Sequence, residues 1–91
     1  KMESFLLEDF IVTEHAKFEM ERRAISLNLV KQVIAHPGQS FLVRKGRRVY
    51  QSLVQISGKQ YVVRIFVDID RSPPEVVTAY RTSKIDKYWE K

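Results

Sequence analysis

The amino-acid sequence contains no cysteine, and it has only three glycines, three prolines and two histidines. Without cysteine, neither a disulfide framework nor a thiolate zinc site can form, so we expect a cytoplasmic protein. The glycines are isolated from one another, which excludes a glycine-rich loop that cradles phosphate. No apolar run approaches the ~20 residues that a membrane-spanning helix needs. His15 and His36 are far apart and lack the carboxylate spacing of a metalloprotease, so we expect neither a metal nor a cofactor.

Positive charge is in excess and is unevenly distributed along the chain. The 91 residues fit one domain over residues 1–91 and carry 16 Lys and Arg against 11 Asp and Glu, a net charge of +5. Acidic residues concentrate near the start, whereas basic residues dominate from Arg44 onward. This polarity favours an anionic partner, either a nucleic acid or an acidic protein, although a merely soluble basic domain would have the same composition.

The first part of the chain predicts two helices after a lead-in. Residues 1–12 have no clear period, so we expect a short strand or an irregular lead-in there. Thr13 and Ser26 are good N-cap residues, and Pro37 ends the second helix because the residue before a proline is pushed out of the α region. The spacing of three to four residues places Ala16, Met20 and Arg23 on one face of the first helix, and Phe18 and Arg22 on another. In the second helix it predicts a buried stripe of Leu29, Val30, Val33 and Ile34.

From residue 40 onward the period changes to two, which predicts strands over residues 41–44, 47–56, 61–69 and 75–80. A tight turn at Gly58 would place Arg64 opposite Gln51 and Arg47 opposite Asp68, whereas a three-residue loop would reverse that parity. After the last strand, the helical spacing returns. We therefore expect an α+β fold in which two N-terminal helices pack on a roughly four-stranded antiparallel sheet, followed by a short C-terminal helix.

Two groups of cations could bind phosphate. The first is the run RKGRR, which contains Arg47 and Arg48. The second is a stripe in which a helix continuing from Arg81 would align Lys84 and Tyr88 with Arg81. Arginine and tyrosine together suit stacking on unpaired bases while gripping the backbone. The alternative is that both groups are simply solvated. Arg64 interrupts the apolar run YVVRIFV, so its charge must reach solvent, pair across strands or bind a ligand.

The side chains that could take part in catalysis are histidine, arginine, lysine and tyrosine, and none of them is a candidate nucleophile. That set is enough for RNA cleavage by the substrate's own 2′-hydroxyl group, which needs a base, an acid and cations on the phosphorane. His15 at the second helical position lies near the positive end of the helix dipole, which favours a neutral imidazole that could act as the base. The other interpretation of His15 is structural, as part of the helix start. We interpret His36 as a helix cap.

Five stretches carry a resemblance to a known family: TEHAKFEMERRAIS, HPG, RRVYQS, YVVRIFVD and VVTAYRTSKIDKYW. Together they resemble a small bacterial family of unknown function that is grouped with the RelE/ParE-like and BrnT-like toxins, and more broadly with nucleases of the barnase–colicin–RelE type. The family pattern maps onto His15, Ala16, Arg23, Arg48, Tyr50, Arg64, Thr78, Tyr80 and Arg81. Ala24 departs from it, because relatives often have glycine before the second helix.

The resemblance implies the toxin of a type II toxin–antitoxin pair, a metal-independent endoribonuclease that cleaves mRNA either free or only on the ribosome. The catalytic residues would be His15, Arg64, Arg81 and Tyr80, and the RNA-binding residues would be Arg47, Arg48, Tyr50, Lys84 and Tyr88. An acidic antitoxin is the expected partner, covering Arg81, Lys84 and Tyr88. The alternatives are a non-catalytic ParE-like inhibitor, an RNA-binding or partner-binding module, and a degenerate member kept only to pair with a regulator.

Overall fold

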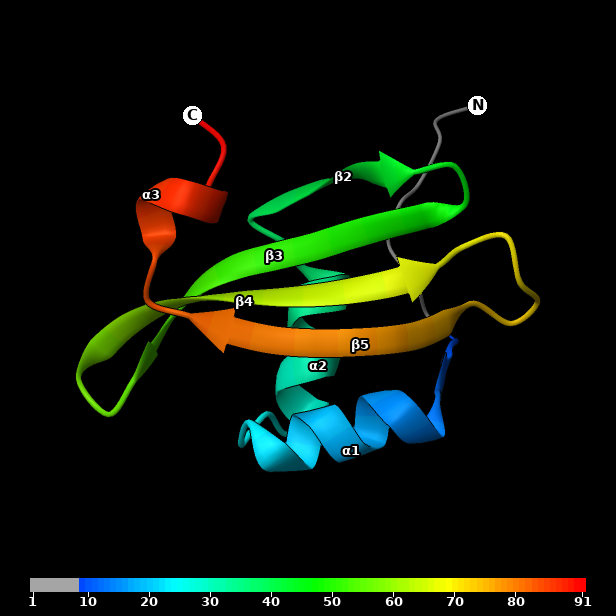
Figure 1. The fold of residues 1–91 in the computed structure, drawn as a ribbon, viewed down its shortest axis with the longest axis horizontal. Coiled ribbons are helices and arrows are strands. Elements are labelled where there is room, and N and C mark those ends of the chain that lie inside the picture. The colour runs from blue at the N-terminus through cyan, green and yellow to red at the C-terminus, as the bar shows by residue number, and fades with distance from the viewer. Residues whose placement is uncertain (1–8) are drawn as a thin grey trace.

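In the computed structural model, which describes residues 9–91, the chain has an α+β fold with a five-stranded mixed sheet (Figure 1). The strand order across the sheet is β1-β5-β4-β3-β2. Neighbouring strands are antiparallel, except that β1 runs parallel to β5. The elements are β1 (Ile11–Val12), α1 (Glu14–Arg22), α2 (Leu27–Ala35), β2 (Gln39–Arg44), β3 (Arg47–Ile56), β4 (Lys59–Asp68), β5 (Glu75–Thr82) and α3 (Ile85–Tyr88).

The sheet has one strand more than the four that the sequence predicted. The additional strand, β1, lies at the end of the expected lead-in, where Ile11 pairs with Glu75 and Val12 with Val76. A strand of two residues is too short to produce a detectable period, and its partner lies far along the chain. The remainder of the expected lead-in, residues 1–8, lies outside the described residues.

The register of the central hairpin agrees with the tight-turn prediction. Ser57 and Gly58 form the turn with φ angles of 52° and 79°, and Ile56 pairs with Lys59. Two consecutive positive φ angles are typical of a type I′ turn, whose twist matches that of the strands. Because the turn fixes the register, Gln51 lies opposite Arg64 and Arg47 lies opposite Asp68, as predicted.

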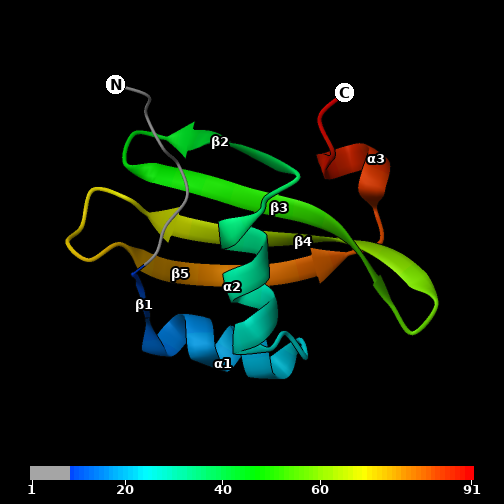
Figure 2. The ribbon, with the colours of Figure 1, turned by 180° about the vertical axis from the view of Figure 1, so that it is seen from behind.

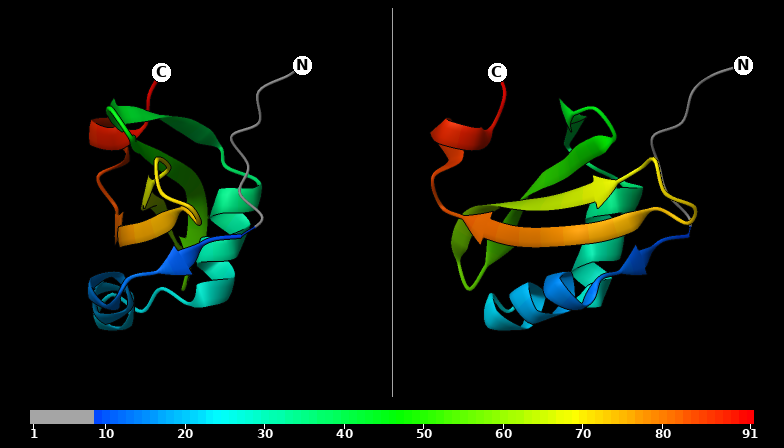
Figure 3. Two further views of the ribbon diagram at one scale, coloured as in Figure 1. Left: turned by 90° about the vertical axis from the view of Figure 1, so that its right-hand side faces the viewer. Right: turned by 45° about the vertical axis from the view of Figure 1, so that its right-hand side comes forward.

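The helices cover one face and one edge of the sheet. Helix α2 crosses the back of the sheet and α1 runs beside β5 (Figure 2), whereas α3 lies on the side away from α2 (Figure 3, left). The predicted helical stripes agree with the structure. The buried members are Ala16, Met20, Val30, Val33 and Ile34, and Leu29 is partly buried against the same core. Arg23 Nη1 donates a hydrogen bond to the Ala79 carbonyl at 3.1 Å. We call the face opposite α2 the open face.

The C-terminal helix is shorter than predicted. Arg81 belongs to β5, where it pairs with Val63, and α3 begins only at Ile85. The expected basic stripe from Arg81 through Lys84 to Tyr88 therefore does not form, because strand pairing continues to Thr82 and imposes a period of two. Over residues 9–91, no helix is both long and apolar enough to cross a bilayer.

Candidate functional site

The centre of the open face holds a buried cation. The Arg64 side chain lies on β4, and the residue is only 8% exposed. Its Nε donates to Gln51 Oε1 at 2.7 Å, and its Nη1 donates to Tyr80 Oη at 2.7 Å. Both partners are neutral, and no carboxylate of residues 9–91 forms an ion pair with Arg64. The guanidinium group is thus held in place while its positive charge stays uncompensated.

Three aromatic rings surround this guanidinium group. Its Cζ lies 4.7 Å from the ring centroid of Tyr88, 5.2 Å from that of Phe66 and 5.7 Å from that of Tyr80. Phe66 and Tyr80 are stacked at 5.9 Å, and Tyr80 meets Tyr88 edge-on at 6.0 Å. The rings provide cation–π stabilisation where charged partners are lacking. We call Gln51, Arg64, Phe66, Tyr80 and Tyr88 the Arg64 cluster.

Gln51 fixes the orientation of the Arg64 cluster. It is fully buried, and its Nε2 donates to Gln39 Oε1 at 2.8 Å and to the Tyr88 carbonyl at 3.1 Å. With both amide protons engaged in this way, Oε1 faces Arg64. Sequence reasoning gave Gln51 no functional role, although its predicted position opposite Arg64 in an apolar strand was the available signal.

A cavity of about 490 Å³ lies at the margin of the open face, and it is lined by Thr13, His15, Arg47, Val77 and Thr78. Thr13 Oγ1 accepts the Ala16 N–H at 3.1 Å, so Thr13 is the residue that caps α1. His15 is exposed, and its side chain makes no hydrogen bond to any residue in the described part of the chain. Its imidazole is therefore available to a ligand in this cavity.

The charge of Arg47 is already engaged by a neighbouring carboxylate. Arg47 Nε lies 2.6 Å from Asp68 Oδ1, and Nη2 lies 3.2 Å from Oδ2, which is a bidentate contact. The hydrogen bond from Arg47 holds the pKa of the buried Asp68 below its ordinary value. A phosphate in the cavity would meet Arg47 as half of an ion pair, which is a weaker attraction than a free cation gives.

The remaining predicted site residues lie elsewhere. Tyr50 is buried in the core under α2, and burial raises the pKa of its hydroxyl group. Arg48 lies on the same face as Tyr50, and its Nη1 donates to Ser40 Oγ at 3.1 Å. Arg81 also points to that side, where its Nε donates to the Arg23 carbonyl at 3.1 Å and its Cζ lies 4.8 Å from the Tyr61 ring. Lys84 is exposed before α3.

The structure therefore divides the predicted site into separate parts. Arg64, Tyr80 and Tyr88 come together, His15 and Arg47 share the neighbouring cavity, and the other predicted residues lie away from both. Strand parity explains the division, because Arg81 follows Tyr80 directly and so points to the opposite face. Among residues 9–91, no group of three or more His, Asp and Glu side chains could hold a metal ion.

Comparison with known families shows which family the chain belongs to. A family described as Domain of unknown function (DUF4258) matches residues 12–81, which is more than half of the chain. The protein belongs to this family. The matched segment contains all of the sheet except Ile11 and Thr82, together with α1, α2 and every member of the Arg64 cluster except Tyr88. No curated protein and no solved structure matches the sequence.

Proposed function

We propose that this member of the DUF4258 family is a RelE-like toxin that binds single-stranded mRNA on its open face and cleaves it through the RNA's own 2′-hydroxyl group. The observation that carries the proposal is the Arg64 cluster, a fixed guanidinium group without a carboxylate partner, bordered by three aromatic rings. A phosphate group supplies the missing negative charge, and unpaired bases stack on exposed parts of the rings.

The position of the cavity that contains His15 supports cleavage in addition to binding. Thr78 lines this cavity, and Tyr80, two residues further along β5, belongs to the Arg64 cluster. Two residues of a strand span about 7 Å, so one RNA strand lying along β5 can reach both places. In this arrangement His15 is the general base and the Arg64 cluster binds the phosphate group.

The chemical step needs no protein nucleophile. His15 accepts the proton of the 2′-hydroxyl group, the 2′-oxygen attacks the adjacent phosphorus, and the bond from phosphorus to the 5′-oxygen breaks. Arg64 stabilises the charge of the pentacoordinate phosphorane. Tyr80 Oη accepts a hydrogen bond from Arg64, so the tyrosine proton remains available for the leaving 5′-oxygen. The products are a 2′,3′-cyclic phosphate and a 5′-hydroxyl end.

Cleavage of naked RNA should be slow. His15 and Arg64 lie on different elements and are not bonded to one another, so the substrate itself has to align the two. A ribosome that presents the mRNA in a fixed conformation would supply this alignment. An acidic antitoxin would then keep the toxin inactive, which agrees with the net charge of +5.

A non-catalytic RNA-binding or ParE-like protein is the second candidate. It is favoured by the low exposure of Arg64 and by the separation of Arg81 from the Arg64 cluster. In that case the cluster would mainly stabilise the sheet and α3, and the aromatic and basic surface around it would bind without turnover.

The first prediction separates these candidates by comparing wild type with Arg64→Ala during induced expression, with mRNA 5′ ends mapped across the transcriptome. We expect new 5′-hydroxyl ends in translated messages, reduced by at least tenfold in the variant because the phosphorane loses its fixed cation. Lys31→Ala, which removes an exposed cation on α2 opposite the open face, is the control and should retain the ends.

Each of the other outcomes would indicate a different function for this protein. Growth arrest without new 5′ ends would favour the binding protein, and the absence of both would favour a partner-binding module. Thermal unfolding of purified Arg64→Ala shows whether the variant is folded. Arg64→Lys preserves the charge but not the bidentate geometry, so it should retain binding better than cleavage.

A further inference from the structure

The outer edge of β3 is only half covered. Its partner β2 pairs with β3 from Arg47 to Gln51, and the last pair joins Gln39 to Gln51. Beyond that point the chain turns away toward α2, with the Gly38 N–H donating to Ser52 Oγ at 3.1 Å. Residues 52–56 of β3 therefore have β4 on one side and no strand on the other among the described residues.

The register identifies the backbone groups that this edge presents. Ile56 and Lys59 close a two-residue turn, so they form a hydrogen-bonded pair, and pairing alternates along an antiparallel ladder. The backbone groups of Leu53 and Gln55 consequently point away from β4. Outside the regular elements of residues 9–91, neither residue takes part in a backbone–backbone hydrogen bond. Such an edge can accept one more strand.

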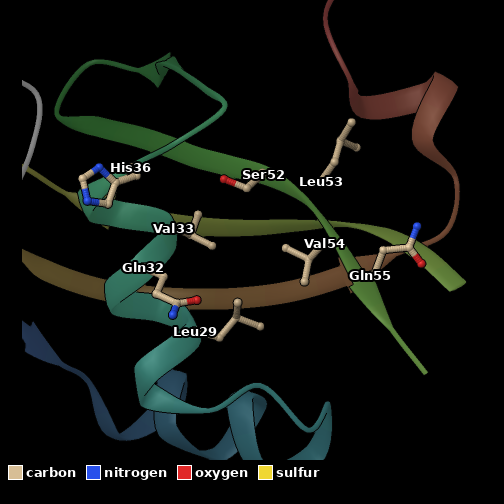
Figure 4. A pocket seen from close by; sticks show the side chains of 8 residues that line it. All are labelled: Leu29, Gln32, Val33, His36, Ser52, Leu53, Val54 and Gln55. Carbon is tan, nitrogen blue, oxygen red and sulfur yellow. The ribbon is translucent and has the colours of Figure 1, made fainter. Parts of the chain in front are cut away.

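An apolar groove accompanies the unpaired edge. It has a volume of about 570 Å³ and lies between α2 and the second half of β3 (Figure 4). Leu29 and Val33 face it from α2, and Val54 faces it from β3, while Leu53 projects to the other side of the strand and is 38% exposed. The remaining residues that line the groove are Gln32, His36, Ser52 and Gln55, and Leu53 borders it as well.

The charge of the surrounding chain selects the partner. No Asp or Glu occurs from Arg22 to Val67, a stretch that includes α2, β2, β3 and nearly all of β4. The groove thus has apolar walls and an unpaired strand edge, and the two elements that form it, α2 and β3, contain no carboxylate. Its complement is an extended peptide with apolar side chains on one face and carboxylates along its length.

We propose that the groove binds an extended acidic peptide segment of a partner protein, which adds as a strand to residues 52–56 of β3 in line with β2. A segment of about five residues spans this edge, roughly 17 Å. Alternate side chains of the added strand enter the groove against Leu29, Val33 and Val54, and the others lie beside Leu53. A second copy of this chain is disfavoured as the partner. Residues 22–67 carry Lys and Arg but no Asp or Glu, so two such stretches would repel each other.

This proposal differs from the sequence-based prediction, in which an acidic partner covers Arg81, Lys84 and Tyr88. It also stands apart from the proposed RNA site, since the groove opens beside α2 and the Arg64 cluster occupies the open face. Loss of RNA cleavage on Arg64→Ala would leave peptide binding intact, so the two proposals fail separately.

The second prediction is tested with a synthetic peptide of about eight alternating Glu and Val residues, added to the isotopically labelled full chain. In the free protein, we expect the amide protons of Leu53 and Gln55 to exchange faster with solvent than those of Val54 and Ile56. The peptide should protect Leu53 and Gln55 and shift the resonances of Leu29 and Val33. A peptide with Lys in place of Glu should bind at least tenfold more weakly.

A pair of variants on α2 provides the matched control. Gln32→Glu adds a negative charge at the groove, whereas Asn28→Asp makes the same chemical change on the same helix away from it. Gln32→Glu should weaken binding of the acidic peptide about three- to fivefold, because it adds one exposed like-charge contact, whereas Asn28→Asp should leave the affinity unchanged. Equal binding of both peptides, shifts confined to the open face, or displacement of the peptide by a single-stranded RNA oligonucleotide would overturn the proposal.

Discussion

Ala24 adopts a backbone conformation that alanine rarely adopts. It follows α1 with a φ of 55°, and the N–H groups of Ala24 and Ile25 donate to the carbonyls of Glu21 and Met20 at 3.2 and 2.9 Å. These two bonds form a Schellman motif, in which glycine is the favoured residue at the left-handed position. The third prediction is that Ala24→Gly raises the free energy of unfolding by about 0.5–1 kcal/mol, because the Cβ strain is removed.

Chemical denaturation with urea measures this change directly. Ala35→Gly makes the same substitution at the last residue of α2, where φ is helical, and it should lower the free energy of unfolding by up to about 1 kcal/mol. If both substitutions destabilised the protein to the same degree, strain at Ala24 would be refuted.

The ion pair between the partly exposed Arg47 and the buried Asp68 makes the free energy of unfolding depend on pH. The pKa of Asp68 is lower in the folded chain than its ordinary value of 3.8, mainly because Arg47 donates a hydrogen bond to the carboxylate. The unfolded chain therefore binds the proton more readily, and the pair stabilises the fold above the ordinary pKa. This stability is lost as the pH falls through the folded pKa, below about 4.

The fourth prediction follows from that sign. Asp68→Asn should cost about 1–3 kcal/mol at pH 7, because Arg47 loses a charged partner, and should flatten the fall in stability between pH 5 and pH 2. Urea unfolding at a series of pH values tests both effects. The control is Asp86→Asn, an exposed carboxylate of α3, which should preserve the wild-type pH profile.

At the scale of elements, α3 is a short cover attached by two glutamines. Gln39 Oε1 accepts the Glu90 N–H at 3.1 Å, Gln51 Nε2 donates to the Tyr88 carbonyl, and the Trp89 ring lies close to Gly38. Tyr88 in turn lies over the Arg64 guanidinium group. Since a helix of one turn has little stability of its own, these side-chain contacts decide whether α3 stays in place.

The fifth prediction is that Gln39→Ala releases α3 without unfolding the sheet. Trp89 is the only tryptophan, so its fluorescence should shift to longer wavelength and become more accessible to iodide quenching. Gln60→Ala, which alters an exposed glutamine of β4, is the matched control. Unchanged fluorescence in Gln39→Ala would show that α3 is held by other contacts.

Several elements could be predicted from the sequence because local rules determine them. The N-caps Thr13 and Ser26 and the buried stripes of both helices depend on spacing within one helix. The register of β3 and β4 depends on the two-residue turn at Gly58. Arg64 and Tyr80 were grouped in one site by the family resemblance, and their pairing across β4 and β5 is what brings the two side chains together.

The features that were missed depend on contacts between distant parts of the chain. The pairing of β1 with β5, the position of α1 beside β5 and the return of α3 onto Gln39 and Gln51 have no local signature. Arg81 was misplaced because its spacing to Lys84 and Tyr88 fits a helix as well as a strand end. Only pairing with Val63 decides between them.

At the scale of the whole molecule, the two proposed binding surfaces lie on different sides of one sheet. The open face presents a fixed cation and aromatic rings, and the edge of β3 beside α2 presents apolar side chains and unpaired backbone. We propose different partners for the two surfaces because their chemistry differs, RNA for the first and an extended acidic peptide for the second. One small domain could therefore hold a substrate and a regulator at the same time.

The parallel pairing of β1 with β5 has a consequence for synthesis of the chain. Ile11, Val12 and Thr13 are made early, yet their backbone partners at Pro74, Glu75 and Val76 are made late. The amphipathic helix α1 lies beside the same late strand, so until β5 leaves the ribosome its buried face has no surface to pack on. A nascent chain thus cannot complete its sheet, or assemble Tyr80 into the Arg64 cluster, before β5 has been translated through Thr82.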